Sequence, residues 1–132
     1  MLELGLWTHN PATNHYYQPL ECGNWEQCEA AAKNLGGHLV TINNATENQW
    51  LVDTFGYTPY WIGLIKKEQP KTWQWISGED TSYTNWLFGQ PDGNGDYGWI
   101  GLDSSSDGWD DCTVDCYNQY AHQGIVEIDI LK

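Results

Sequence analysis

The sequence contains no arginine and only five lysines among its 132 residues, against 18 aspartates and glutamates. Its formal net charge is therefore -13. Nucleic acids and anionic membranes are bound through basic patches, so this deficit argues against both as partners. No apolar run is long enough to cross a bilayer and no signal peptide is visible after Met1, so we expect no membrane insertion.

Aromatic residues, by contrast, are abundant, with nine tryptophans and eight tyrosines. Rings of this size fill a core with few residues, and some of them are expected at a surface where one edge stays wet. The length is that of one domain with one hydrophobic core. We therefore expect residues 1–132 to form a single domain.

The acidic residues are concentrated near the C-terminus, where seven of the 18 lie between Asp92 and Asp115. Within a glycine-rich stretch from Gly89 to Asp111 there is no lysine or arginine, and five oxygen-bearing side chains stand out: Gln90, Asp92, Asp96, Asp110 and Asp111. Hard oxygen ligands at this density favour Ca²⁺. The alternative interpretation is a solvated acidic loop that only aids solubility.

The four cysteines form two close pairs, Cys22/Cys28 and Cys112/Cys116. An even number in a small acidic chain indicates disulfides and an oxidising compartment, so we expect a secreted or extracellular protein. A zinc site is the alternative, but the four histidines are scattered along the chain, at positions 9, 15, 38 and 122.

Local signals predict two helices and six strands. The first helix runs from Trp25 to Leu35 with Asn24 as its N-cap, and the second follows Asn43 or Asn44 and ends before Gly56. The strands are expected at 13–20, 38–42, 60–64, 72–76, 99–102 and 124–128. Residues 80–98 lack regular periodicity, which is typical of a functional loop. Asn44 also begins a glycosylation sequon, as an alternative to its capping function.

This order of signals resembles that of the C-type lectin-like domain over nearly the whole chain, from about Tyr16 to Ile128. The segments that carry the resemblance are Trp25 to Ile42, Asn44 to Leu51, Trp61-Ile62-Gly63-Leu64, Trp73 and Trp75 before Gly78-Glu79, Asn85-Trp86, Gln90-Pro91-Asp92, Trp109-Asp110-Asp111 and Gly124 to Ile128. No single segment is specific, but together they make a strong match.

The resemblance implies an α+β fold in which two helices flank twisted antiparallel sheets, with a long calcium-binding loop at about residues 80–112. The strands near the two termini are expected to pair. Four tryptophans are then expected in the core, together with Trp109: Trp61, Trp73, Trp75 and Trp86.

The chain departs from this family in its cysteines. Ala32 and Val126 stand where the family's long-range bridge would be, so packing is expected to replace the bridge, and Gly98 stands where a second bridge would begin. We favour two local bridges, Cys22–Cys28 and Cys112–Cys116, although the sequence leaves pairing between the two pairs open.

The resemblance also implies a site. Gln90 and Asp92 would flank a cis-proline, and they would bind Ca²⁺ together with Asp96, Asp110 and Asp111. The ion would hold two vicinal hydroxyls of a sugar that also contacts Gln90, Asp92, Asp96 and Asp110, with its apolar face on Tyr97. In the family, the order Gln-Pro-Asp goes with galactose-type sugars, so glycans with terminal galactose or GalNAc are the expected partners.

Asp110 is the main departure at this site, because the family has an asparagine there whose amide donates to the sugar. Its presence favours calcium affinity over sugar affinity. It leaves open a second reading, in which the same fold keeps Ca²⁺ for structure and binds a protein or an ice surface. The carboxylates are better explained by one cation site than by acid–base chemistry, so no enzyme is expected. Any homo-oligomer must form through the surfaces of the domain.

Overall fold

The structure is a computed structural model that describes residues 7–56, 58–67, 72–91, 93, 95–101, 107–113 and 123–129. Its elements follow one another in the order β1 (Thr8–Asn10), β2 (His15–Glu21), α1 (Trp25–Asn34), β3 (His38–Leu39), α2 (Ala45–Phe55), β4 (Tyr60–Lys66), β5 (Trp73–Trp75), β6 (Tyr97–Ile100), β7 (Trp109–Cys112) and β8 (Gln123–Ile128). The α+β fold with two helices is therefore confirmed.

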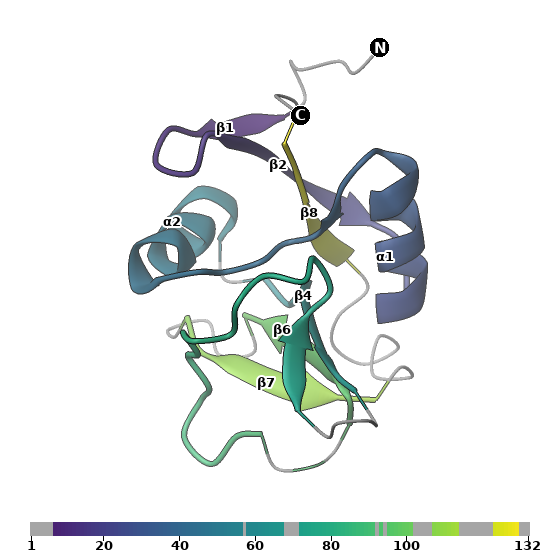
Figure 1. Ribbon diagram of the computed structural model, residues 1–132, viewed down its shortest axis with the longest axis vertical. Helices are drawn as coiled ribbons and strands as arrows, with labels where there is room; N and C mark the ends of the chain where they lie inside the picture. Colours follow the sequence, from purple (N-terminus) through teal and green to yellow (C-terminus); the bar gives the residue numbers. More distant parts are fainter. Residues whose placement is uncertain are drawn as a thin grey trace.

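The strands form one connected sheet in the order β1-β2-β8-β4-β6-β7, with β3 attached to β8 and β5 attached to β4. β2 and β8 are antiparallel, so the strands near the two termini pair as predicted. β4 and β8 are parallel, which makes the sheet mixed rather than purely antiparallel. β1 lies at one end of the molecule together with the C-terminal end of β8, and β7 lies toward the opposite end (Figure 1).

Both helices begin where the capping residues predict. Asn24 accepts a hydrogen bond from the backbone of Gln27, whose side chain accepts one from the backbone of Asn24 in return. Asn44 caps α2 in the same way by accepting from Glu47. In α1, the buried Ala32 belongs to the same apolar cluster as Val126 of β8, so the two residues pack together as expected.

Tryptophans dominate the core. Trp61, Trp75 and Trp109 are almost fully buried, as predicted. Trp73 and Trp86 are only partly buried, and their ring centroids lie 5.0 Å apart at the edge of the main cluster. The ring of Trp109 meets those of Trp75, Tyr83 and Trp86 edge-on, so it anchors the start of β7 in the core.

Two strands were not predicted, and the bounds of several others differ from those expected. β1 and β7 lack the alternation typical of strands, and β7 carries two adjacent aspartates that favour a loop in a local reading. Its strand conformation comes from pairing with β6 across the register Gly98↔Asp111. β3 extends over two residues only, whereas 38–42 was expected. β5 covers only Trp73–Trp75 where 72–76 was expected, and β6 covers Tyr97–Ile100 where 99–102 was expected. The region 80–112 therefore contains two strands besides its loops.

Cys22 is joined to Cys28 by a disulfide, as predicted. Cys112 is disulfide-bonded as well, and its expected partner Cys116 lies outside the described residues. The zinc alternative is therefore wrong for the first pair. A β-carbon added to Gly98 would lie 2.9 Å from Cβ of Leu64, so this position of β6 has no room for the cysteine that the family pattern would place there.

Candidate functional site

The candidate site is built on β7, and hydrogen bonds to a buried residue of the core hold the start of this strand in place. The indole Nε1 of Trp109 donates to Oδ1 of Asn48 at 2.8 Å, and Asn48 donates from Nδ2 to the backbone oxygen of Asp107 at 3.0 Å. Asn48 belongs to α2 and is fully buried. A polar pair inside the core thus ties α2 to the strand that carries two of the predicted ligands.

Asp111 holds part of the loop onto β7. Its side chain is turned inward and the residue is 1% exposed, while Oδ2 accepts hydrogen bonds from the backbone N–H of Gly93 at 3.1 Å and of Gly95 at 3.3 Å. The backbone N–H of Asp111 donates to Oδ1 of Asp110 at 2.8 Å. The two hydrogen bonds from Gly93 and Gly95 join the loop to β7, so Asp111 organises this part of the loop.

The Gln90 side of the loop is fixed to the same strand. The Gln90-Pro91 peptide bond is cis, as the resemblance implied. The backbone N–H of Gln90 donates to the oxygen of Leu87, and the N–H of Leu87 donates to the oxygen of Trp109, both at 2.9 Å. Gln90 and Asp111 therefore belong to segments that meet at the start of β7. Asp92 lies outside the described residues.

Asp96 and Tyr97 have partners elsewhere. The exposed Asp96 carboxylate lies 3.8 Å from Nζ of Lys66 on β4, so the loop is not without a neighbouring cation, contrary to the expectation from its own sequence. The Tyr97 ring packs 4.9 Å from Trp25, and its hydroxyl donates to Oε2 of Glu26 at 3.1 Å. Partial burial raises the pKa of Tyr97 to about 12. Its predicted contact with a sugar remains a prediction.

The donors at this site are carboxylate and amide oxygens, which is the ligand chemistry of Ca²⁺. Over the ranges that the structure describes, no three acidic, histidine or cysteine side chains converge closely enough to hold a metal. That set does not include Asp92. The predicted ligand set of Gln90, Asp92, Asp96, Asp110 and Asp111 therefore remains a prediction.

A second polar cluster, which the sequence reading missed, lies between β2, α2 and β8. The hydroxyl of Tyr17 donates to Oε2 of Glu47 at 2.9 Å and lies 3.3 Å from Oε2 of Glu127. The same Glu127 oxygen accepts from Nδ1 of His15. Burial is the main cause that raises the pKa of Glu47, to about 7, and burial also raises that of Glu127.

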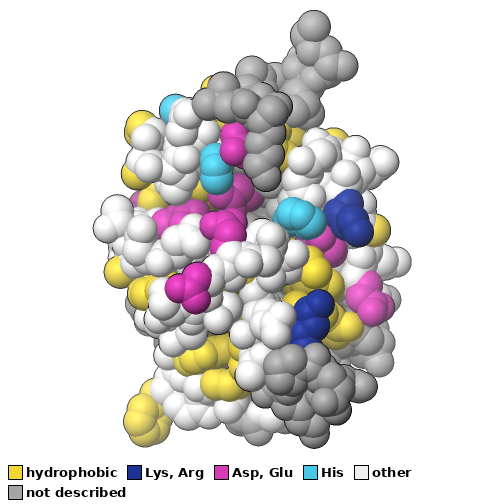
Figure 2. Space-filling view, viewed as in Figure 1, with side chains coloured by type: hydrophobic (Ala, Val, Ile, Leu, Met, Phe, Trp, Pro, Cys, Tyr) yellow, Lys and Arg dark blue, Asp and Glu magenta, His cyan; other side chains and the backbone are white. Residues whose placement is uncertain are grey.

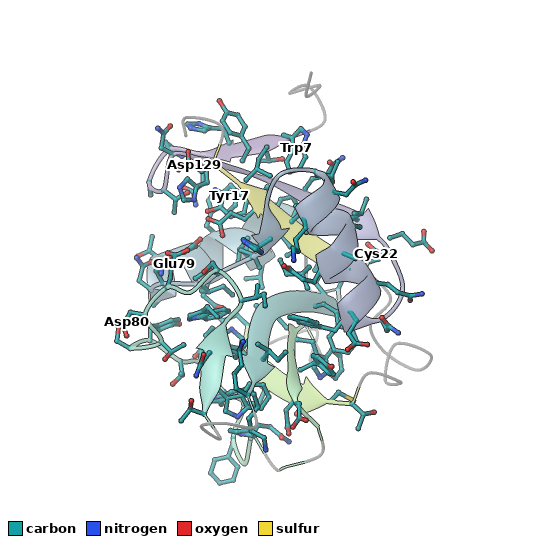
Figure 3. All side chains as sticks on the ribbon, turned by 45° about the vertical axis from the view of Figure 1, so that its right-hand side comes forward. Trp7, Tyr17, Cys22, Glu79, Asp80 and Asp129 are labelled. Atoms are coloured by element: carbon teal, nitrogen blue, oxygen red, sulfur yellow. A yellow bond between two sulfur atoms is a disulfide. The ribbon has the colours of Figure 1, made fainter. Side chains whose placement is uncertain are left out.

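This cluster borders a cleft of about 360 Å³ whose lining includes His15, His38, Glu79, Glu127 and Asp129. Figure 2 shows acidic side chains with histidines beside them on that face. Figure 3 places Tyr17, Glu79 and Asp129 on one side of the molecule and Cys22 on the other. An acidic residue inside the apolar run 124–128 was the signal in the sequence that could have revealed Glu127.

Neither α1 nor α2, the helices found in the described part of the chain, is long and apolar enough to cross a membrane.

Comparison with known proteins gives consistent results. The profile described as "Lectin C-type domain" matches residues 22–122. Hepatic lectin of Gallus gallus is 30% identical over 106 residues, which cover 77% of this chain and 51% of hepatic lectin. Perlucin-like protein of Mytilus galloprovincialis is 32% identical over 85 residues, which cover 60% of this chain and 54% of that protein. The chain thus spans about half the length of these curated relatives.

Solved structures extend the similarity to the fold. The carbohydrate-recognition domain of the mouse scavenger receptor C-type lectin is 30% identical, with a TM-score of 0.75 and coverage of 92% of this chain and 93% of that one. A calcium-independent type II antifreeze protein is 22% identical, with a TM-score of 0.80 and coverage of 96% and 93%. The second similarity shows a common fold alone.

Proposed function

This chain belongs to the C-type lectin family, and from that premise we propose that it is a calcium-dependent protein that binds glycans with terminal galactose or GalNAc. The observation that carries the proposal is the buried Asp111 carboxylate, which accepts hydrogen bonds from Gly93 and Gly95 and so holds the loop against β7. This anchors the loop next to the strand that carries Asp110 and Asp111.

Five side chains would hold the ion: Gln90, Asp92, Asp96, Asp110 and Asp111. Ca²⁺ accepts six to eight oxygen ligands, so a bound ion supplies free positions for two vicinal hydroxyls of one sugar. The carboxylates that flank these positions accept hydrogen bonds from the sugar hydroxyls, and the Gln90 amide donates a hydrogen bond to a hydroxyl oxygen. The order of amide and carboxylate around Pro91 is the basis for proposing a galactose-type rather than a mannose-type orientation.

Asp110 supports a second candidate function. A carboxylate accepts hydrogen bonds but cannot donate one, so a sugar hydroxyl at this position loses a donor. A missing partner in a buried contact costs about 1–3 kcal/mol, which is large beside the affinity of a single sugar. The alternative is a domain whose calcium is structural and whose loop surface binds a protein or ice.

Thermal unfolding with calcium and with chelator tests the metal. At a free calcium concentration one hundred times Kd, binding stabilises the folded state by about 2.7 kcal/mol, which corresponds to a rise in Tm of roughly 10 °C for a domain of this size. Magnesium at equal concentration serves as the control, because its smaller octahedral shell does not suit this loop. Equal Tm values with calcium and with chelator would reject a calcium site.

Calorimetric titration with methyl β-galactoside, in calcium and in chelator, tests the sugar. We expect binding in calcium only, and competition by GalNAc but not by methyl α-mannoside. A calcium-dependent Tm without any galactoside bound at millimolar concentration would support the alternative function instead. The two experiments therefore separate the loss of the metal from the loss of the sugar.

The family assignment confirms that this domain is not an enzyme. Secretion remains a proposal that the disulfides support. Single sites for monosaccharides bind weakly, so avidity requires several domains presented together. We propose that any such assembly forms through the surfaces of the domain.

A further inference from the structure

The side chain of Phe88 lies in solvent rather than in the hydrophobic core. Among the described residues it is the only large hydrophobic side chain that the fold leaves exposed, at 105% of its reference area. Burying a phenylalanine contributes about 1.5–3 kcal/mol, and this position forgoes that contribution. A single exposed apolar residue is common by itself. Phe88 differs in the way its backbone is held and in the residues that follow it.

The backbone at Phe88 is fixed at both ends. Residues 87–90 form a turn closed by the hydrogen bond from the N–H of Gln90 to the oxygen of Leu87 at 2.9 Å. Gly89 has φ +83°, the left-handed conformation that the third position of a type II turn requires. The N–H of Leu87 donates to the oxygen of Trp109, whose own N–H donates to the oxygen of Asn85 at 2.8 Å. The Phe88 ring is therefore carried by a turn whose backbone is fixed by hydrogen bonds.

The turn also leads directly into the candidate site. Its last residue, Gln90, is the first of the proposed ligands, and the strand that anchors it continues into Asp110 and Asp111. The Leu87 side chain packs over Gly108, since a β-carbon there would lie 2.5 Å from Leu87 Cδ2. Leu87 thus anchors the turn by its side chain, while the neighbouring Phe88, two residues before Gln90, is exposed to solvent.

The other aromatic candidate near the site is already engaged. Tyr97 packs against Trp25 and donates to Glu26, so its ring faces α1. Sugars carry apolar C–H faces besides their hydroxyls, and aromatic rings in binding sites cover such faces while polar groups fix the orientation. An exposed ring two residues from an ion ligand fits this function.

We propose that Phe88 contacts the group attached to the ion-bound sugar, so that the site takes an extended glycoside rather than a monosaccharide alone. This inference rests on the proposed function. The shared chemistry of the occupant is an apolar face next to the anomeric position of the ion-bound sugar. A second sugar ring and an aryl aglycone both offer that face.

Calorimetry in calcium with three probes tests the inference: methyl β-galactoside, phenyl β-galactoside and methyl β-lactoside. We expect the wild-type protein to bind at least one extended probe about 2- to 10-fold more tightly than methyl β-galactoside, the range of one aromatic contact. In Phe88→Ala the ratio of the affinity for the extended probe to that for methyl β-galactoside falls toward one. Phe88→Tyr keeps the ratio of the wild type because the ring remains. Thr84→Ala, an exposed truncation in the same loop, also keeps it.

The outcomes separate the two proposals. An advantage that is absent, or equal in the wild type and Phe88→Ala, rejects the contact while methyl β-galactoside binding still supports the proposed function. If the wild type binds none of the three probes, the proposed function and this inference fall together. An advantage for one extended probe only identifies the aryl or the sugar source. Sedimentation velocity tests the remaining possible occupant, a second copy of this chain. If the wild type self-associates and Phe88→Ala does not, Phe88 is a contact between copies and the inference is overturned.

Discussion

Replacing Glu47 by glutamine should make the protein more stable at neutral and alkaline pH. Glu47 is 2% exposed and lies in α2, where Oε2 accepts from Tyr17 and Oε1 accepts from the backbone N–H of Asn43. The groups that face it are Tyr17 on β2, Glu127 on β8 and Glu79 in the loop after β5. Burial, more than these charges, raises its pKa from 4.5 to about 7.

The sign of the effect follows from proton binding. Between pH 4.5 and about 7 the folded state holds a proton on Glu47 that the unfolded state has released. The free energy of unfolding therefore falls as pH rises through this window and stays low above it. At about 1.4 kcal/mol per pKa unit, the buried charge costs roughly 3 kcal/mol above pH 7. Glutamine removes this cost, because it is neutral and can still accept one hydrogen bond and donate another.

Urea unfolding of the wild type and of Glu47→Gln, at several pH values between 4 and 8.5, would measure the effect. Chelator in every sample keeps metal binding from varying with pH. We expect similar stabilities near pH 4 and a gap that opens to as much as about 3 kcal/mol above pH 7. Some slope remains in the variant, because burial also raises the pKa of Glu127.

Glu21→Gln is the matched control, since Glu21 is exposed on β2 and loses the same charge. This control measures how much the loss of any one negative charge raises the free energy of unfolding of a chain with net charge -13. If both variants run parallel to the wild type across the whole pH range, Glu47 is ionised in the folded state without cost and the reasoning is wrong.

Two further substitutions test the candidate site and its support. Asp110→Asn restores a donor while its Oδ1 can still accept from the N–H of Asp111, so we expect tighter binding of methyl β-galactoside and weaker binding of calcium by calorimetry; unchanged values for both would show that Asp110 contacts neither. Asn48→Ala leaves the indole N–H of the buried Trp109 without its acceptor, and should lower the free energy of unfolding by about 1–3 kcal/mol. In the same urea assay, the exposed amide of Asn43 provides the comparison, since Asn43→Ala should stay within about 0.5 kcal/mol of the wild type; equal losses in both variants would mean that the buried amide has no special importance.

Several features of the fold could be predicted because their causes are local. Asn24 and Asn44 cap helices through hydrogen bonds to residues three positions away, so a short stretch of sequence contains the whole interaction. Cys22 and Cys28 are close enough in the chain for a local bridge. The resemblance added what local signals lack, including the pairing of the terminal strands and the apolar contact of Ala32 with Val126.

The candidate site was predictable only in part. The clustering of oxygen-bearing side chains along the loop is visible in the sequence. The resemblance also predicted that the Gln90-Pro91 peptide bond is cis. The direction in which each side chain points is not visible in the sequence. Asp96 lies next to Lys66 from a strand thirty residues earlier, and Tyr97 bonds to Glu26 of α1, because the folded chain brings these partners from distant positions.

By itself, the sequence determined where the helices start, which residues are apolar enough for the core, and that a chain without arginine gathers carboxylates in one glycine-rich region. These properties depend on near neighbours and on composition. Only the tertiary structure decided that Asp110 and Asp111 lie on a strand, that Asp111 is buried beneath the loop, and that Glu47 and Glu127 share one hydroxyl. Strand pairing and burial are contacts between residues far apart in the chain, and burial is what turns an ordinary carboxylate into a loop anchor or a group with a raised pKa.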